Sequence, residues 1–174
     1  GGQPGEAPVA LVGKGVMFDS GGYSLKSKMA TMHDDMGGAA AVIGAIRAIA
    51  LQKLPVNVIA VVAACENRVS GDAYVPGRYP VLHERKDHRD AECRRRGPSD
   101  PGRRHHLRIR KEGAGAIIDI ATLTGAAKGA VGGRSAAVLA NDDELYEEVL
   151  EASRISCEKI WRLPADKELF TVLQ

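Results

Sequence analysis

Three stretches of this chain are almost continuously apolar, which is the pattern of strands that are covered on both faces. They span residues 7–12, 56–65 and 114–123. The first is expected to end in a glycine-bearing turn at Gly13-Lys14-Gly15. Strands buried on both faces are typical of the mostly parallel sheets of α/β domains.

Two helices are predicted from the spacing of apolar and polar residues. Small and aliphatic residues recur at helical spacing from about Asp35 to Lys53, and Pro55 marks the end of that helix. Residues 142–157 have an amphipathic pattern that opens with acids, as a helix N-terminus prefers. The order strand, helix, strand, strand, helix predicts an α/β domain with a mainly parallel sheet flanked by helices.

The overall composition is that of a globular protein, with 44% apolar residues and no run approaching the ~18 that a membrane span needs. Residues 1–8 lack the features of a signal peptide, and the absence of an initiator Met suggests a piece of a longer protein. Three widely spaced cysteines favour a reducing, intracellular setting. We therefore expect a cytoplasmic protein without a membrane partner.

One window departs from the rest of the chain. Residues 83–111 contain nine Arg and two Lys against five acids, which gives this window a charge of +6 where the whole chain has +2. Few apolar residues and no regular period occur between 78 and 110. By composition this stretch is expected to be disordered or a solvated loop.

Candidate chemistry lies in the glycine-rich segment 12–38, which holds Lys14, Asp19, Lys26 and Asp35. Pairs of divalent metal ions need several carboxylates that converge on one place. From composition alone, however, the same acids are expected to be solvated loop residues and a helix N-cap at Asp35. Lysines near aspartates are most often surface ion pairs.

The order of the residues resembles the leucyl (cytosol) aminopeptidase family. The similar motifs are V-G-K-G-V-M-F-D-S-G-G-Y-S-L-K (12–26), D-M-G-G-A-A-A-V (35–42), L-P-V-N-V-I (54–59), C-E-N (65–67), S-G-D-A-Y-V-P-G (70–77), A-T-L-T-G-A (121–126) and W-R-L-P (161–164). They follow the family's order at close to its spacing. The resemblance implies part of a three-layer metallopeptidase catalytic domain across 1–174, incomplete at both ends.

The resemblance also implies roles for single residues. Lys14 matches a metal ligand that binds as a neutral amine, Asp19 matches the carboxylate that bridges two metal ions, and Asp35 matches a third ligand. Lys26 matches the catalytic lysine, whose ammonium stabilises negative charge on the scissile carbonyl. The implied cofactors are two divalent ions, Mn²⁺ or Zn²⁺, which activate a water.

Four further residues match substrate-binding positions of the family. Met32 matches a residue that lines the pocket for the first side chain of the substrate, and three others, Thr122, Leu123 and Gly125, match positions whose backbone binds the peptide. The implied activity is release of N-terminal amino acids, leucine among them, from peptides with a free N-terminus. Family members assemble as homo-hexamers.

The family's second core motif, N-T-D-A-E-G-R, is missing. It supplies two metal-binding carboxylates and an arginine that positions a bicarbonate acting as base. Counted from Gly77, these three positions hold Arg94, Arg96 and Pro98. Two cations in place of two carboxylates would repel metal ions.

We hypothesise that a double frameshift produced the basic window. The residues A-E-C-R-R-R-G at 91–97 can be encoded by bases that, read one base later, give L-N-A-D-A-E, the missing motif in its proper register. The same shift turns residues 83–89 and 102–107 into sequences similar to the family. The window from about 78 to 108 would then be a sequencing error or the mark of a decayed gene.

Three alternatives remain beside an active peptidase. The chain can be a catalytically dead relative that keeps the fold and lacks half of the metal site. The window can be a genuine basic insertion that binds a polyanion, although it has no aromatic residue besides Tyr79 and no recognisable nucleic-acid-binding fold. A separate metal site at His83, His88, His105 and His106 matches no ligand spacing that we know.

Overall fold

The computed structural model describes residues 2, 4–76, 109, 113–166 and 168. By its internal contacts the chain divides into two compact units, Gly1–Thr122 and Leu123–Gln174, and each is described by itself. The window of basic residues lies outside the described residues, apart from Ile109. No helix in the described part of the chain is long and apolar enough to cross a membrane.

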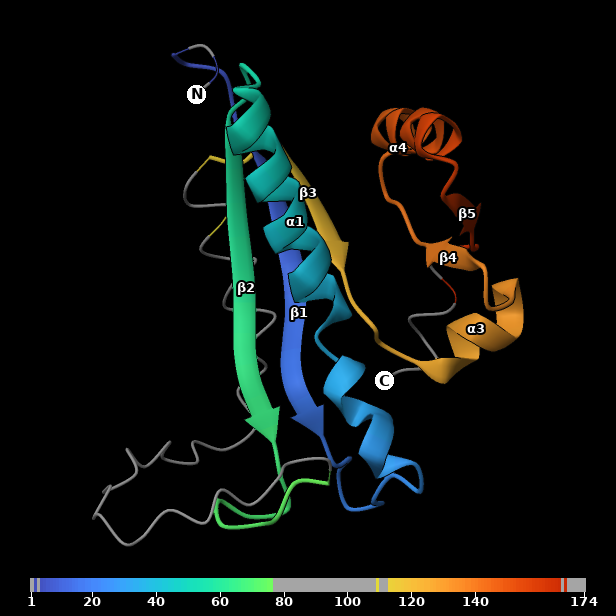
Figure 1. Ribbon diagram of the computed structural model, residues 1–174. Helices are drawn as coiled ribbons and strands as arrows, with labels where there is room; N and C mark the ends of the chain where they lie inside the picture. The colour runs from blue at the N-terminus through green and yellow to red at the C-terminus, as the bar shows by residue number, and fades with distance from the viewer. Residues whose placement is uncertain (1, 3, 77–108, 110–112, 167, 169–174) are drawn as a thin grey trace, which may run out of the picture. The chain divides into compact units, whose positions relative to one another are not determined.

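The first unit is a three-stranded parallel sheet with one long helix along it (Figure 1). The strand order is β2-β1-β3, so the first strand is central and pairs in parallel with both neighbours. In chain order the elements are β1 (Val9–Asp19), the 3-10 helix η1 (Met29–Asp34), α1 (Gly37–Gln52), β2 (Val58–Asn67) and β3 (Ala116–Ile120).

The turn predicted at Gly13-Lys14-Gly15 is wrong, because β1 continues through it to Asp19. The glycines serve packing instead of turning the chain. A Cβ on Gly13 would lie 2.7 Å from the Gly38 carbonyl oxygen and 2.8 Å from the Ala39 Cα atom. Gly13 therefore lets the start of α1 approach the strand closely, and the strand can run on to the edge where the sheet ends.

The start of α1 is pressed even more tightly against β3. A Cβ on Gly38 would lie 1.8 Å from the Ile120 carbonyl oxygen, so only glycine fits there. The predicted N-cap at Asp35 is also wrong, since the N-cap residue is Met36 and makes no side-chain cap bond. The Asp35 side chain is directed to other partners, which are described below.

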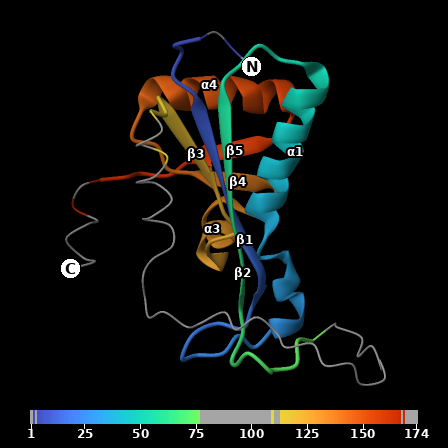
Figure 2. The same cartoon turned by 90° about the vertical axis from the view of Figure 1, so that its left-hand side faces the viewer.

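Apolar side chains of the sheet form the core of the first unit. Ala10, Val12 and Ile109 are buried together, and partly buried aliphatic residues of β2 and β3 pack around them. Val42 of α1 is completely buried, as expected for the face of the helix that covers the sheet. Figure 2, turned by 90°, shows α1 beside the upper part of the sheet, while β1 and β2 continue below it.

The second unit contains two short parallel strands and two helices that the sequence only partly predicts. Its elements are α3 (Gly125–Val131), β4 (Ser135–Val138), α4 (Asp143–Ser156) and β5 (Lys159–Arg162), with β4 and β5 paired in parallel. The predicted helix at 142–157 is α4, and Asp142 caps it by accepting a hydrogen bond from the Leu145 amide at 3.0 Å. Parallel sheets flanked by helices confirm the predicted α/β class.

Candidate metal and catalytic site

The predicted site residues of the first unit lie near the carboxyl ends of β1 and β3; Lys14, in the middle of β1, comes one residue after the position paired with the last residue of β3. In an α/β sheet this edge is where ligands bind, because the loops that leave the strands meet there. Asp19 is the last residue of β1, and Thr122 follows the end of β3. Asp35 stands between η1 and α1, where the tight glycine packing brings the start of the helix to this edge.

Lys14 and Asp35 form the first of two ion pairs. The Lys14 Nζ atom donates to Asp35 Oδ1 at 2.7 Å and to the Thr122 carbonyl oxygen at 3.1 Å. The Thr122 hydroxyl donates to the same Asp35 Oδ1 at 2.8 Å. Residues from β1, from the start of α1 and from the end of β3 therefore meet in one hydrogen-bonded group.

Asp35 is not the solvated loop acid that its composition suggested. Only 4% of the residue is exposed. Its second oxygen, Oδ2, is buried and has no hydrogen-bond partner among the described residues. A buried carboxylate oxygen without a partner is costly. Such an oxygen fits a cation ligand, because a bound cation would replace the missing partner.

Lys26 and Asp19 form the second ion pair, with Nζ and Oδ2 2.5 Å apart. Partial burial by itself would raise the pKa of Asp19. Hydrogen bonds from Lys26, Asn67 and the Gly21 amide, with the charge of Lys26, outweigh it and lower the pKa from 3.8 to about 2. The hydrogen bond to Asp19 in turn raises the pKa of Lys26, and the charges of Asp19, Asp35 and Asp34 add to this.

The two pairs belong to one electrostatic environment. The Asp35 carboxylate acts on the pKa of Lys26, although it pairs with Lys14. Lys26 Nζ also lies 3.1 Å from the Met32 sulfur, so the residue expected to line a substrate pocket touches the expected catalytic lysine. Among the described residues, no three His, Cys, Asp or Glu side chains form a cluster that could hold a metal ion. Lys14, a residue type outside that set, lies beside Asp35.

The other expected residues belong elsewhere. Leu123, with 78% of its surface exposed, and Gly125, the first residue of α3, are part of the second unit. The positions 94, 96 and 98 lie outside the described residues. Asn67 was missed as a site residue: its side chain donates to Asp19 Oδ1 at 2.7 Å. The available signal was its place in the family-like motif C-E-N at 65–67, although that motif does not indicate which side chain it contacts.

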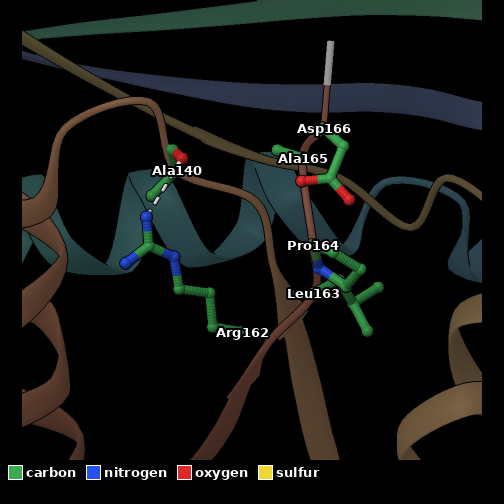
Figure 3. Close-up of a pocket in the computed structure, with 6 residues that line it drawn as sticks. All are labelled: Ala140, Arg162, Leu163, Pro164, Ala165 and Asp166. Carbon is green, nitrogen blue, oxygen red and sulfur yellow. Dashed lines mark hydrogen bonds between the residues drawn. The ribbon is translucent and has the colours of Figure 1, made fainter. Parts of the chain in front are cut away.

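The second unit has a pocket that shares no residue with this group. Its volume is about 390 Å³. Figure 3 shows the residues that line it, which are Ala140, Arg162, Leu163, Pro164, Ala165 and Asp166. The Arg162 guanidinium is held by structural partners. It donates to the Ala140 carbonyl oxygen at 3.5 Å and to Asp143 at 2.5 Å, and it lies 4.7 Å from the centre of the Tyr146 ring. We assign no chemistry to this pocket.

Comparison with known proteins decides the family. The family model described as the catalytic domain of the cytosol aminopeptidase family matches residues 1–87 and 106–174. The chain belongs to the cytosol aminopeptidase family. The unmatched stretch, 88–105, falls inside the basic window where the family's second core motif is missing from the sequence.

Relatives of the cytosol aminopeptidase family align over nearly the whole chain. A probable cytosol aminopeptidase of Clostridium perfringens is 51% identical over 90% of this chain and 32% of its own length. The corresponding protein of Clostridium tetani is 43% identical over 92% of this chain and 34% of its own length. The chain thus spans about a third of these curated relatives.

Two solved structures are similar to this chain in sequence and in fold. The bottromycin maturation enzyme BotP is 32% identical, with a TM-score of 0.69 over 99% of this chain and 37% of its own. A mutant of tomato leucine aminopeptidase is 34% identical, with a TM-score of 0.65 over 96% of this chain and 32% of its own. BotP has also been solved in complex with Mn.

Proposed function

We propose that the first unit carries part of the active site of a metal-dependent aminopeptidase that releases N-terminal residues from peptides. The observation behind this proposal is the pair of Lys–Asp contacts at the carboxyl edge of the sheet, within residues that match the family. Charged groups that shift one another's pKa values, as Asp19 and Lys26 do, are frequent at functional sites. The relatives are described as probable cytosol aminopeptidases, which agrees with the proposed reaction.

Lys14, Asp19 and Asp35 are the proposed ligands of divalent metal ions. Mn²⁺ is our first choice, since a similar solved structure contains it, and Zn²⁺ is the second. When bound, such ions supply positive charge that activates a water and holds the amine of the substrate. The partnerless oxygen of Asp35 supports its role as a ligand. Lys14 would have to act as a neutral amine, which exchanges its bond with Asp35 for one to a cation.

Lys26 is the proposed electrostatic catalyst. Its ammonium lies at the end of a flexible side chain beside Asp19, and 39% of the side chain is exposed. From there it can approach the carbonyl oxygen of a bound peptide and stabilise the negative charge that develops on it. Met32, in contact with Lys26, is proposed to line the pocket for the first side chain.

Thr122, Leu123 and Gly125 are proposed to bind the peptide backbone, as a strand added to a sheet edge would. In the first unit the Thr122 carbonyl oxygen already accepts a hydrogen bond from Lys14, so binding through this residue would couple the peptide to the metal ligands. A hexamer and a cytoplasmic location are proposed for the complete protein by analogy with its family, and a bicarbonate base is not proposed for this chain because position 98 is Pro.

A catalytically dead relative is the second candidate, and Arg94 and Arg96 favour it. Both occupy positions where the family has metal-binding carboxylates. We propose that the window 78–108 arose by a double frameshift, and that an intact version of this chain has carboxylates there. With the two arginines in place, the ligand set would be incomplete, and repulsion between cations would oppose metal binding.

The test compares the chain with a variant that restores the motif, Arg94→Asp/Arg96→Glu/Pro98→Arg. Each is titrated with Mn²⁺ by calorimetry and assayed for hydrolysis of a leucyl amide. We expect no hydrolysis by the chain itself and Mn²⁺ binding by the restored variant, which Asp19→Ala and Asp35→Ala abolish. Mn²⁺ binding that neither aspartate variant weakens would refute the assigned ligands. Sequencing of the coding DNA across codons 77–110 tests the frameshift independently.

A further inference from the structure

Asn67, the last residue of β2, stands directly beside Asp19 at the carboxyl edge of the sheet. The pairing of β1 with β2 contains an irregularity between Val16 and Phe18, after which Asp19 is aligned with Asn67. One extra residue in a strand moves all later residues of that strand by one place against its neighbour. The irregularity therefore determines that an amide, and no other residue of β2, lies opposite the carboxylate.

The Asn67 side chain joins two acceptors. Its Nδ2 atom donates to Asp19 Oδ1 at 2.7 Å and to the Gly21 carbonyl oxygen at 2.7 Å. A carboxylate at neutral pH and a carbonyl can only accept, so the NH₂ end of the amide must face them, and both of its hydrogens are used. Neither Asp nor Leu, the residues closest in shape, could make either bond.

The Asn67 main chain binds Ser20, the residue between Asp19 and Gly21. Its carbonyl oxygen accepts hydrogen bonds from the Ser20 amide at 2.9 Å and from the Ser20 hydroxyl at 2.7 Å. Asn67 thus bonds to three consecutive residues, from Asp19 to Gly21, where the chain leaves the sheet. The two bonds to the Asn67 carbonyl oxygen do not depend on the identity of the Asn67 side chain, whereas the two bonds from its amide do.

These contacts leave the Asp19 carboxylate with one orientation. Oδ1 accepts from the Asn67 amide and from the Gly21 amide at 3.1 Å, while Oδ2 faces Lys26. A carboxylate with both oxygens engaged in different directions cannot rotate without losing at least two hydrogen bonds. Partners of this kind, which orient a ligand without touching the metal, commonly change metal affinity by about 10- to 100-fold.

We propose that Asn67 is a positioning residue, which orients Asp19 through its side-chain amide and holds the turn that follows. The inference rests on the proposed function, because the orientation of Asp19 matters most when Asp19 is a metal ligand. Its physical content is independent of metal: without the Asn67 amide, the Asp19 carboxylate and the Gly21 carbonyl oxygen lose their common donor. The alternative is that Asn67 serves only through its main chain, as the end of the strand pair.

The experiment uses the full metal-free chain, isotope-labelled for NMR, with Asn67→Leu, which keeps the bulk of the side chain, and Asn67→Ala. Asn57→Ala is the matched control. Asn57 is also an amide beside β2, at the opposite end of that strand, where it donates to the Glu6 carbonyl oxygen at 3.1 Å and accepts from the Gly2 amide at 3.0 Å. Unchanged β1 signals in each variant establish that the sheet is intact.

In both Asn67 variants the Asp19 carboxylate loses the donor that orients it toward the Gly21 amide, so we expect that amide to exchange with solvent about tenfold faster. The Asp19 carboxyl carbon signal should shift as well, and neither signal should move in Asn57→Ala. Unchanged Gly21 and Asp19 signals in a folded Asn67 variant would overturn the proposal. A separate experiment titrates Mn²⁺ into the restored variant with and without Asn67→Leu. If neither protein binds Mn²⁺, the proposed metal site is wrong. The NMR result still decides the role of Asn67, because it does not depend on metal.

Discussion

The two Lys–Asp pairs lie at the same edge of the sheet and are held by different means. Lys14 and Asp35 are joined beneath the start of α1, and their side chains are 23% and 5% exposed. Lys26 and Asp19 are joined at the rim, and their side chains are 39% and 15% exposed. The first pair depends on how closely a helix packs on two strands. The second depends on hydrogen bonds that cross from one strand end to the next.

In the proposed site, the Lys14–Asp35 pair is therefore fixed in position, whereas the Lys26–Asp19 pair can adjust. Asp35 can move only if the start of α1 moves, because Gly37 and Gly38 place that segment against the end of β3. Lys26 is attached to a loop and loses little when its partner changes, since exposed ion pairs contribute about 1 kcal/mol or less. A rigid ligand beside a movable ammonium suits a site that must hold cations firmly while it binds different peptides.

Gly38→Ala should have the largest effect, because it disrupts the packing of α1 on β3 that places Asp35 beside Lys14. The new Cβ would lie 1.8 Å from the Ile120 carbonyl oxygen, and a backbone oxygen cannot rotate away as a side chain can. We expect the free energy of unfolding, measured by denaturant titration, to fall by about 3 kcal/mol.

Gly44→Ala in the same helix is the control for Gly38→Ala. No atom lies within 4 Å of a Cβ at this position. Alanine favours helix more than glycine does, so this variant should gain roughly 0.5–1 kcal/mol. Equal effects of the two substitutions would show that the close approach of α1 to β3 is not what holds the first pair in place.

Removal of Asp35 should lower the free energy of unfolding more than removal of Asp19. Asp35→Ala leaves the partly buried Lys14 ammonium with only the Thr122 carbonyl oxygen, so we expect a loss of about 2 kcal/mol in the free energy of unfolding. Asp19→Ala affects a more exposed pair and should cost about 1 kcal/mol. Asp34→Ala, an exposed neighbour of Asp35, should change stability by less than about 0.5 kcal/mol. A greater loss for Asp19→Ala than for Asp35→Ala would reverse our assignment of the rigid pair.

The sequence predicted the strands and helices wherever a long apolar run or a helical period was present. Residues 56–65 and 142–157 lie within about two residues of β2 and α4. The short strands β4 and β5, four residues each, gave no such signal. The error at Gly13-Lys14-Gly15 has a physical cause. A glycine that permits a turn and a glycine that permits a close helix contact look alike until the helix is in place.

The candidate site was predictable in its residue types and less so in its contacts. Ordered motifs singled out Lys14, Asp19, Lys26 and Asp35, and the structure brings each lysine to an aspartate. The sequence could not predict which lysine pairs with which aspartate, because that depends on the path of η1 and α1. The side-chain contact of Asn67 depends on an irregularity in strand pairing that leaves no mark in the sequence itself.

The smallest predicted effect concerns the pH dependence of the rim pair. A carboxyl whose pKa is lowered on folding stabilises the fold above its unfolded pKa, and this contribution is lost as the pH falls through the folded value. For Asp19 the window runs from about 3.8 down to about 2. The raised pKa of Lys26 has the opposite sign: its contribution is complete below 10.5 and is lost only as the pH rises through the higher folded value.

Between pH 5 and pH 2.5 the chain should therefore lose more stability than Asp19→Asn does, by on the order of 1 kcal/mol after screening by solvent. Denaturant titrations of both proteins at the two pH values measure this difference. Other carboxyls titrate in the same range, but they are common to both proteins and cancel in the comparison. If the two proteins lose the same amount, Asp19 is not stabilised as a carboxylate by Lys26 and Asn67, and the rim pair is a loose contact that needs no orienting amide.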